Sequence, residues 1–95
     1  MNYYYKPNRY VRVYPEIRAA WRPDHHVIAV SWEGYSAELT HVLQHQIPRP
    51  LRWWSPGHQC WFVRDLWAGP LHQILRTHGE IRVWDVPERL ERKAS

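Results

Sequence analysis

The chain has 95 residues, which is enough for one domain and excludes two. Its 13 Lys and Arg residues outnumber 9 Asp and Glu residues, for a formal net charge of +4. No run of about eighteen apolar residues occurs, so we expect no membrane partner. The first residues form no apolar leader, and the single cysteine, Cys60, cannot form an internal disulfide. We therefore expect a cytoplasmic or nucleoid-associated protein.

The aromatic and basic residues suggest a binding role. Seven Trp, six Tyr and one Phe exceed what so small a core needs, so some of these rings should be exposed for recognition. The charge excess lies in residues 1–23, where five basic residues accompany Glu16 alone, whereas the rest of the chain has eight of each sign. This asymmetry favours a polyanionic partner. Ordinary solubility charge is the alternative.

Residues 1–23 are predicted to form a basic aromatic arm. Tyr10 to Tyr14 alternates like a strand, but Pro7 and Pro15 bracket it, so most of the segment resembles an extended arm. Tyrosines alternate there with Lys and Arg, a pattern that can meet phosphates while the rings stack on bases. We expect this arm to supply affinity that does not depend on sequence.

Residues 24–86 are predicted to form a small α+β sandwich, an antiparallel sheet with two helices. Strands are expected at 26–32, 51–54, 60–63 and 80–86, with a turn at 55–58. A helix capped by Ser36 should run to about Gln46, and a second, capped by Asp65, should end near Gly79. The order β-α-β-β-α-β is that of a ferredoxin-like fold. The charged tail 87–95 is expected to be a frayed helix or disordered.

The segment from about residue 27 to 86 resembles the HARP-type module found beside annealing-helicase motors. The matching pieces are Ser31-Trp32, the helix start Tyr35 to Leu39, the exit Gln46-Ile47-Pro48 and, most specifically, Arg52-Trp53-Trp54-Ser55-Pro56-Gly57-His58-Gln59-Cys60-Trp61-Phe62-Val63. The resemblance implies a module that binds DNA, more than RNA, by structure rather than by sequence. It also implies that Trp54 and Trp61 form a core pair. Because the chain lacks a helicase motor, the resemblance implies binding and not remodelling.

Strand alternation predicts a second face of the hairpin, carrying Trp53, Phe62 and Arg64. One interpretation is a base-stacking platform completed by Arg52, Arg82 and Trp84; the other is a sheet face covered by a protein partner. A bulge near Pro50 would exchange the roles of Trp53 and Trp54. The full set of predicted nucleic-acid-binding residues is Tyr5, Lys6, Arg9, Arg12, Arg52, Trp53, Phe62, Arg64, Arg82 and Trp84.

Metal binding and catalysis find little support in the sequence. His41 and His45 have helical i, i+4 spacing and His58 lies near Cys60, but a zinc site needs three or four ligands and no CxxC motif occurs. The chain has no phosphate-binding glycine-rich loop, HExxH motif or nucleophile elbow. We therefore expect no cofactor, no metal and no enzymatic activity. A nucleic-acid-binding module is the leading hypothesis, and a protein-interaction subunit is the alternative.

Overall fold

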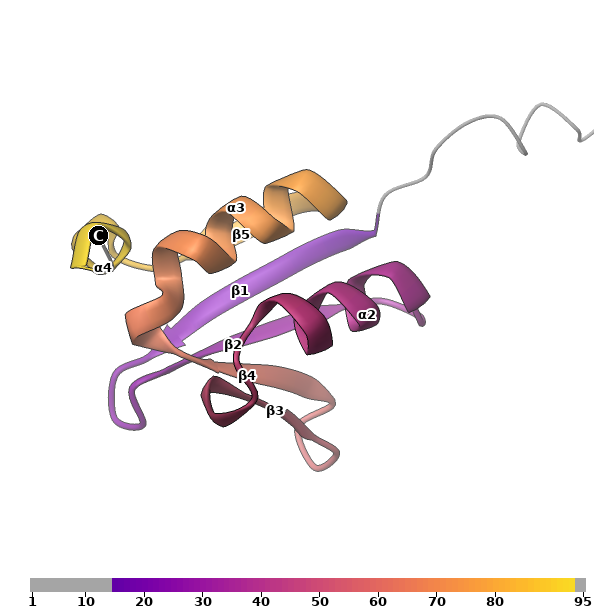
Figure 1. Cartoon of the computed structure of the whole chain (residues 1–95), viewed down its shortest axis with the longest axis horizontal. Coiled ribbons are helices and arrows are strands. Elements are labelled where there is room, and N and C mark those ends of the chain that lie inside the picture. Colours follow the sequence, from indigo (N-terminus) through magenta and orange to yellow (C-terminus); the bar gives the residue numbers. More distant parts are fainter. Residues whose placement is uncertain (1–14, 94–95) are drawn as a thin grey trace, which may run out of the picture.

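The computed structural model describes residues 15–93, which form one five-stranded sheet with two main helices (Figure 1). The predicted α+β class is confirmed. The elements in chain order are β1 (Glu16–Arg22), β2 (Val27–Trp32), α2 (Ala37–Gln46), β3 (Arg52–Ser55), β4 (Cys60–Arg64), α3 (Ala68–His78), β5 (Glu80–Asp85) and α4 (Glu88–Lys93). Short 3-10 turns, Arg49–Leu51 and Asp65–Trp67, precede β3 and α3. None of the helices described is long and apolar enough to cross a membrane.

The strands lie in the order β3-β4-β2-β1-β5. From β2 to β5 the elements follow the predicted order β-α-β-β-α-β. Strand β4 lies between β2 and β3 and is antiparallel to both, so the β2-α2-β3 unit is split by a strand from later in the chain. This arrangement leaves β3, a strand of four residues, at one edge of the sheet and β5 at the other.

Strand β1 corrects two predictions. It is inserted between β2 and β5, antiparallel to the first and parallel to the second, so the sheet is mixed and not antiparallel. Its residues 16–22 had been assigned to the arm, which therefore does not extend to residue 23. The strand was missed because this short segment was counted with the basic residues of the arm, although Ile17, Ala19 and Trp21 recur at alternate positions.

Helices α2 and α3 lie on the same face of the sheet (Figure 1). Ser36 caps α2 as predicted, because its Oγ accepts a hydrogen bond from Leu39 N at 3.2 Å. The main core between the helices and the sheet is almost wholly aliphatic. Its fully buried large side chains are Ile17, Ile28, Val30, Leu39, Leu43, Ile47, Val63, Leu71 and Leu75. In the part of the chain that the structure describes, no helix lies on the other face of the sheet (Figure 1).

The start of α3 differs from the prediction. Asp65 does not cap the helix, since the turn Asp65–Trp67 precedes it and its N-cap residue, Trp67, makes no side-chain cap hydrogen bond. Asp65 instead accepts a hydrogen bond from Trp21 Nε1 at 3.0 Å, which ties this turn to β1. Gly79 does end the helix, and its N–H donates to Leu75 O. A Cβ at Gly79 would collide with the end of the Ile17 side chain and lie 3.2 Å from Pro15 O, so close packing on β1 favours glycine there.

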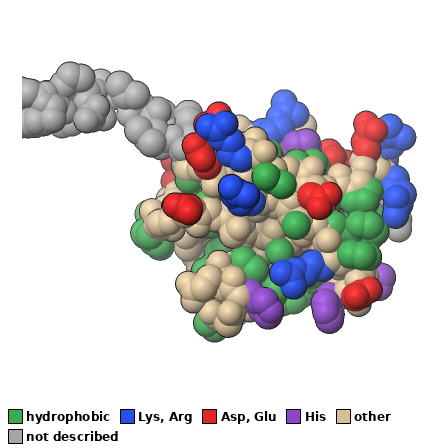
Figure 2. All heavy atoms as spheres, turned by 180° about the vertical axis from the view of Figure 1, so that it is seen from behind, with side chains coloured by type: hydrophobic (Ala, Val, Ile, Leu, Met, Phe, Trp, Pro, Cys, Tyr) green, Lys and Arg blue, Asp and Glu red, His purple; other side chains and the backbone are tan. Residues whose placement is uncertain are grey.

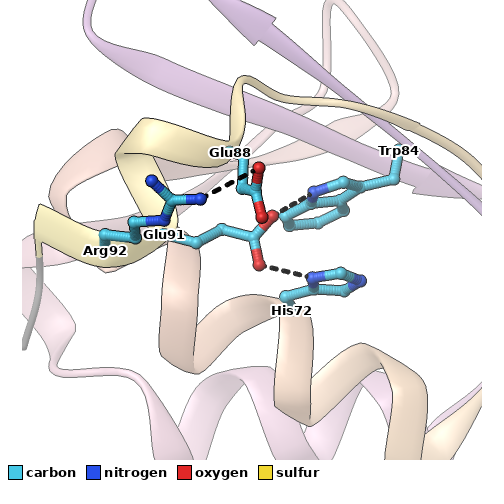
Figure 3. A network of polar contacts seen from close by, with 5 residues as sticks. All are labelled: His72, Trp84, Glu88, Glu91 and Arg92. Atoms are coloured by element: carbon cyan, nitrogen blue, oxygen red, sulfur yellow. Dashed lines mark hydrogen bonds and ion pairs between the residues drawn. The ribbon is translucent and has the colours of Figure 1, made fainter.

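The segment after β5 is a docked helix, α4, and not the frayed or disordered tail that was predicted. Glu91 accepts a hydrogen bond from Trp84 Nε1 at 2.9 Å and lies 2.7 Å from His72 Nδ1 (Figure 3). The His72 ring also stacks on Trp84, with centroids 4.1 Å apart. Val86 and Leu90 are buried beside this network. A helix was one of the two predicted alternatives, but its docking was not predicted, because a six-residue element depends on such tertiary contacts.

Candidate nucleic-acid interface

The β3–β4 hairpin has the predicted alternation. Trp54 pairs with Trp61 on the helix side of the sheet, and Trp53 pairs with Phe62 on the open side. Trp61 is buried, as expected, but Trp54 is 45% exposed, so the prediction of a core pair is wrong for Trp54. The reason is its position: β3 is an edge strand, and nothing among the described residues covers the outer side of its tryptophan.

On the open side, two arginines adjoin the Trp53–Phe62 pair. The ring centroids of Trp53 and Phe62 lie 5.7 Å apart. The Arg64 guanidinium carbon lies 5.0 Å from the Trp53 centroid, and that of Arg22 lies 5.7 Å from the Phe62 centroid. These distances fall within the range of cation–π contacts. We call these four residues (Arg22, Trp53, Phe62 and Arg64) the hairpin-face cluster.

The two rings of this cluster have different accessibilities. Phe62 is only 9% exposed, because Val27 and Cys60 pack with it in a small second hydrophobic cluster. Trp53 is 38% exposed at the sheet edge. Phe62 is therefore a packed ring, contrary to the expectation that it would be accessible, and Trp53 is the accessible ring of the pair.

A depression of about 340 Å³ lies over this cluster. His25 and His58 join its margin, and no Asp or Glu side chain lines it. His58 contacts Phe62 edge-on with centroids 5.6 Å apart, and its Nδ1 lies 3.0 Å from Ser55 Oγ. Figure 2, viewed from behind Figure 1, shows Arg and His side chains lying between hydrophobic ones on this side of the molecule.

The depression is electropositive. Within residues 15–93, no carboxylate lies within 4.0 Å of the Arg22 or Arg64 guanidinium, although both side chains are exposed. Arg64 Nη1 donates a hydrogen bond to His25 O at 3.2 Å, which holds the guanidinium near Trp53. Burial raises the pKa of the neighbouring Cys60 thiol, and the Arg22 charge only partly opposes this, so Cys60 is a packed neutral thiol.

Three of the predicted platform residues lie elsewhere. Arg52 extends on the helix side of β3, where it donates hydrogen bonds to Gln44 O at 2.6 Å and Ile47 O at 3.1 Å. Trp84 packs against the main core in contact with α4. Arg82 lies on β5, at the opposite edge of the sheet, 3.0 Å from Glu16 Oε2.

The misplacement of Trp84 has a local cause. The β1–β5 register pairs Ile17 with Ile81 but Arg18 with Val83, so Arg82 is an extra residue in β5. A bulge of this kind reverses side-chain parity along the strand. The prediction that Arg82 and Trp84 lie on one side with Trp53 is therefore wrong.

Arg22 was missed as a site residue. It ends β1, whose inward residues Ile17, Ala19 and Trp21 place Arg22 on the open face beside Phe62. The available signal was the alternation of apolar and charged residues from 16 to 22, which had been assigned to the arm. The predicted arm residues Tyr5, Lys6, Arg9 and Arg12 lie outside the described residues.

The histidines considered as metal ligands do not gather into a site. His41 and His45 contact each other on the exposed side of α2, with ring centroids 4.0 Å apart. Among residues 15–93, no group of three His, Cys, Asp or Glu side chains is placed to hold a metal ion. Comparison with family models, with curated proteins and with solved structures found no match to this chain.

Proposed function

We propose that this chain is a non-catalytic nucleic-acid-binding protein that recognises the backbone and exposed bases, or branched structure, and not a base sequence. The observation that carries the proposal is the hairpin-face cluster. Arg64 lies over Trp53, which is 38% exposed, and Arg22 lies over the paired Phe62. Both arginines are exposed, and among residues 15–93 neither has a carboxylate within 4.0 Å. Arginine binds phosphate through its planar guanidinium, and an indole ring stacks on any base. The depression above the cluster has room for the phosphate and the base of one nucleotide.

DNA is the proposed ligand in preference to RNA, in agreement with the resemblance of the hairpin to the HARP-type module. The arm residues Tyr5, Lys6, Arg9 and Arg12 are proposed to add phosphate contacts and stacking. A cytoplasmic or nucleoid-associated location follows from such a partner. The alternative, a protein-interaction subunit, rests on the same exposed Trp53 and Trp54 at an edge strand.

The test is a titration of labelled single-stranded, duplex and forked DNA at two salt concentrations. Phosphate contacts predict affinity that falls steeply with salt, whereas an apolar protein interface does not. Trp53→Ala should weaken DNA binding by about 1–3 kcal/mol, the range for one lost stack, with little change in the melting temperature. Leu66→Ala, which removes an exposed apolar side chain outside the cluster, is the control. Absence of salt-dependent binding to all three DNAs would contradict the proposal.

The contribution of the arm is tested by deleting residues 1–14. The deletion keeps Pro15, whose carbonyl accepts a hydrogen bond from Glu80 N at 2.9 Å, so the start of β1 retains its anchor. Weaker binding and a smaller salt slope are expected, because Lys6, Arg9 and Arg12 are lost. An unchanged slope would show that the segment makes no phosphate contacts.

A further inference from the structure

Strand β3 presents two consecutive tryptophans to opposite sides of the sheet edge. Trp53 projects to the open side and is 38% exposed, and Trp54 projects to the helix side and is 45% exposed. Each borders its own depression. That of Trp53 belongs to the hairpin-face cluster, and that of Trp54 has about 360 Å³ and lies between the β2–α2 turn and the hairpin. We call the second one the helix-side pocket.

The helix-side pocket has aromatic walls and a neutral polar rim. Four aromatic side chains line it, and those of Trp54 and Trp61 meet edge-on with centroids 5.7 Å apart. Tyr35, at the mouth, is 81% exposed. The polar residues that line the pocket are Ser31, Thr40, Gln44 and Gln59, and no Lys, Arg, His, Asp or Glu lines it.

This lining matches the chemistry of a nucleobase. A base is planar and uncharged, stacks on indole and phenol rings, and carries donors and acceptors along its edge. Amide side chains can both donate to and accept from such an edge. A purely aliphatic partner would leave the amide and hydroxyl groups unsatisfied, and a phosphate would find no cation within the pocket. The hydrogen bonds of Arg52 to α2 hold the hairpin against this helix and so help to fix the shape of the pocket.

We propose that the helix-side pocket takes an unpaired base from the same DNA strand whose neighbouring nucleotides contact the hairpin-face cluster, so that the strand crosses the β3 edge. The inference rests on the proposed function and narrows it to single-stranded segments. A paired base cannot enter, because its edge and faces are occupied within the duplex. The two exposed tryptophans are adjacent in sequence, so one short single-stranded segment can reach both.

The first experiment measures affinities of the full chain for oligothymidylates of about 3 to 12 nucleotides and for a duplex of matched length. Trp54→Ala and Tyr35→Ala remove one wall each, and Tyr35 is exposed enough that its loss should not affect folding. Each variant should bind the longer oligothymidylates about 5- to 150-fold more weakly, the range for one lost stack, and the duplex unchanged. Leu66→Ala is again the control, and melting temperatures verify folding.

The second experiment identifies the occupant directly. Thymidine or adenosine, added to the full chain, should shift the indole N–H resonance of Trp54 and the ring resonances of Tyr35. Shifts caused by N-acetyltyrosinamide and by neither nucleoside would overturn the proposal in favour of a peptide-binding pocket. If Trp53→Ala weakens DNA binding and the Trp54 and Tyr35 variants do not, the pocket assignment fails while the proposed function stands. If no DNA binds, both fail.

Discussion

Tryptophan and arginine side chains lie near both edges of the sheet, but they have protein partners at the β5 edge and are exposed near the β3 edge. At the β5 edge, Trp84 donates its indole N–H to Glu91, and Arg82 lies between Glu16 at 3.0 Å and Glu80 at 3.9 Å. At the β3 edge, Trp53 and Trp54 are exposed on either side of the strand. Arg64, over Trp53, and Arg22, over the paired Phe62, have no carboxylate within salt-bridge distance among the described residues.

The difference shows that residue type alone does not mark a binding site. At the β5 edge, the tryptophan has a hydrogen-bond partner on a docked helix and the arginine has carboxylate partners, so both side chains have a structural role. Where such carboxylates and a docked helix are absent, a tryptophan and an arginine are available to a ligand. The hydrogen bond to Glu16 and the negative charges of Glu16 and Glu80 raise the pKa of Arg82, so its guanidinium is already engaged within the protein. The following predictions test this contrast, from the largest expected effect to the smallest.

The largest effect is expected from Trp84→Ala at the β5 edge. The change removes a partly buried ring that packs on the main core, stacks on His72 and donates to Glu91. We expect unfolding to become easier by about 2–4 kcal/mol, somewhat less than for a fully buried aromatic residue. Urea and thermal denaturation measure the loss. DNA affinity below the melting transition should be unchanged, and selective loss of binding without loss of stability would contradict the contrast between the edges.

The next effect concerns the charge of the hairpin-face cluster. Replacing Arg22 and Arg64 together with Ala should weaken binding to single-stranded DNA about 10- to 100-fold at low salt. The slope of log affinity against log salt should fall by about 1.4, the value for two lost phosphate contacts. The matched control is Arg82→Ala, whose guanidinium already has carboxylate partners. An Arg82 variant that loses as much affinity would show that the two edges do not differ.

A moderate loss of stability is expected from Glu91→Gln. Burial opposes ionisation, but the hydrogen bonds from His72 and Trp84 outweigh it and lower the pKa of Glu91. A carboxyl group with a lowered folded-state pKa stabilises the fold above its ordinary pKa, and this contribution disappears as the pH falls through the lowered value. The variant should lose about 1–2 kcal/mol at neutral pH, the range for a charged hydrogen bond in a partly exposed network. Unfolding at several pH values measures it, and a difference that persists in strong acid would rule out this cause.

The smallest effect is expected from removing the carboxylate partners of Arg82 at the β5 edge. Glu16→Gln with Glu80→Gln removes the two carboxylates that accompany Arg82, all three side chains being more than half exposed. Stability should scarcely change, because exposed ion pairs contribute little. Affinity for DNA should rise about two- to threefold at low salt, since a guanidinium is released and the field becomes more positive. Glu88→Gln, which removes an exposed carboxylate on α4 that is paired with Arg92, is the control for the general change in field.

Local sequence signals determined the elements from residue 27 to 86. Ser36 is found at the start of α2, Gly79 at the end of α3, and Trp53 and Trp54 on opposite faces of β3. These features depend on near neighbours in the chain, namely a cap, a helix end and a period of two. The α+β class and the separation of the two hairpin faces could therefore be predicted from the sequence.

Tertiary structure alone decided the features that depend on distant partners. Strand β1 exists because β2 and β5 pair with it on either side, and α4 because Trp84 and His72 meet Glu91. The extra residue Arg82 reverses the parity of β5, which no local pattern could indicate. Arg22 joins the hairpin-face cluster only through the sheet order, since 40 residues of sequence separate it from Phe62. Such contacts are set by pairing and packing across the fold, because a single strand's own pattern specifies neither its neighbours nor its register.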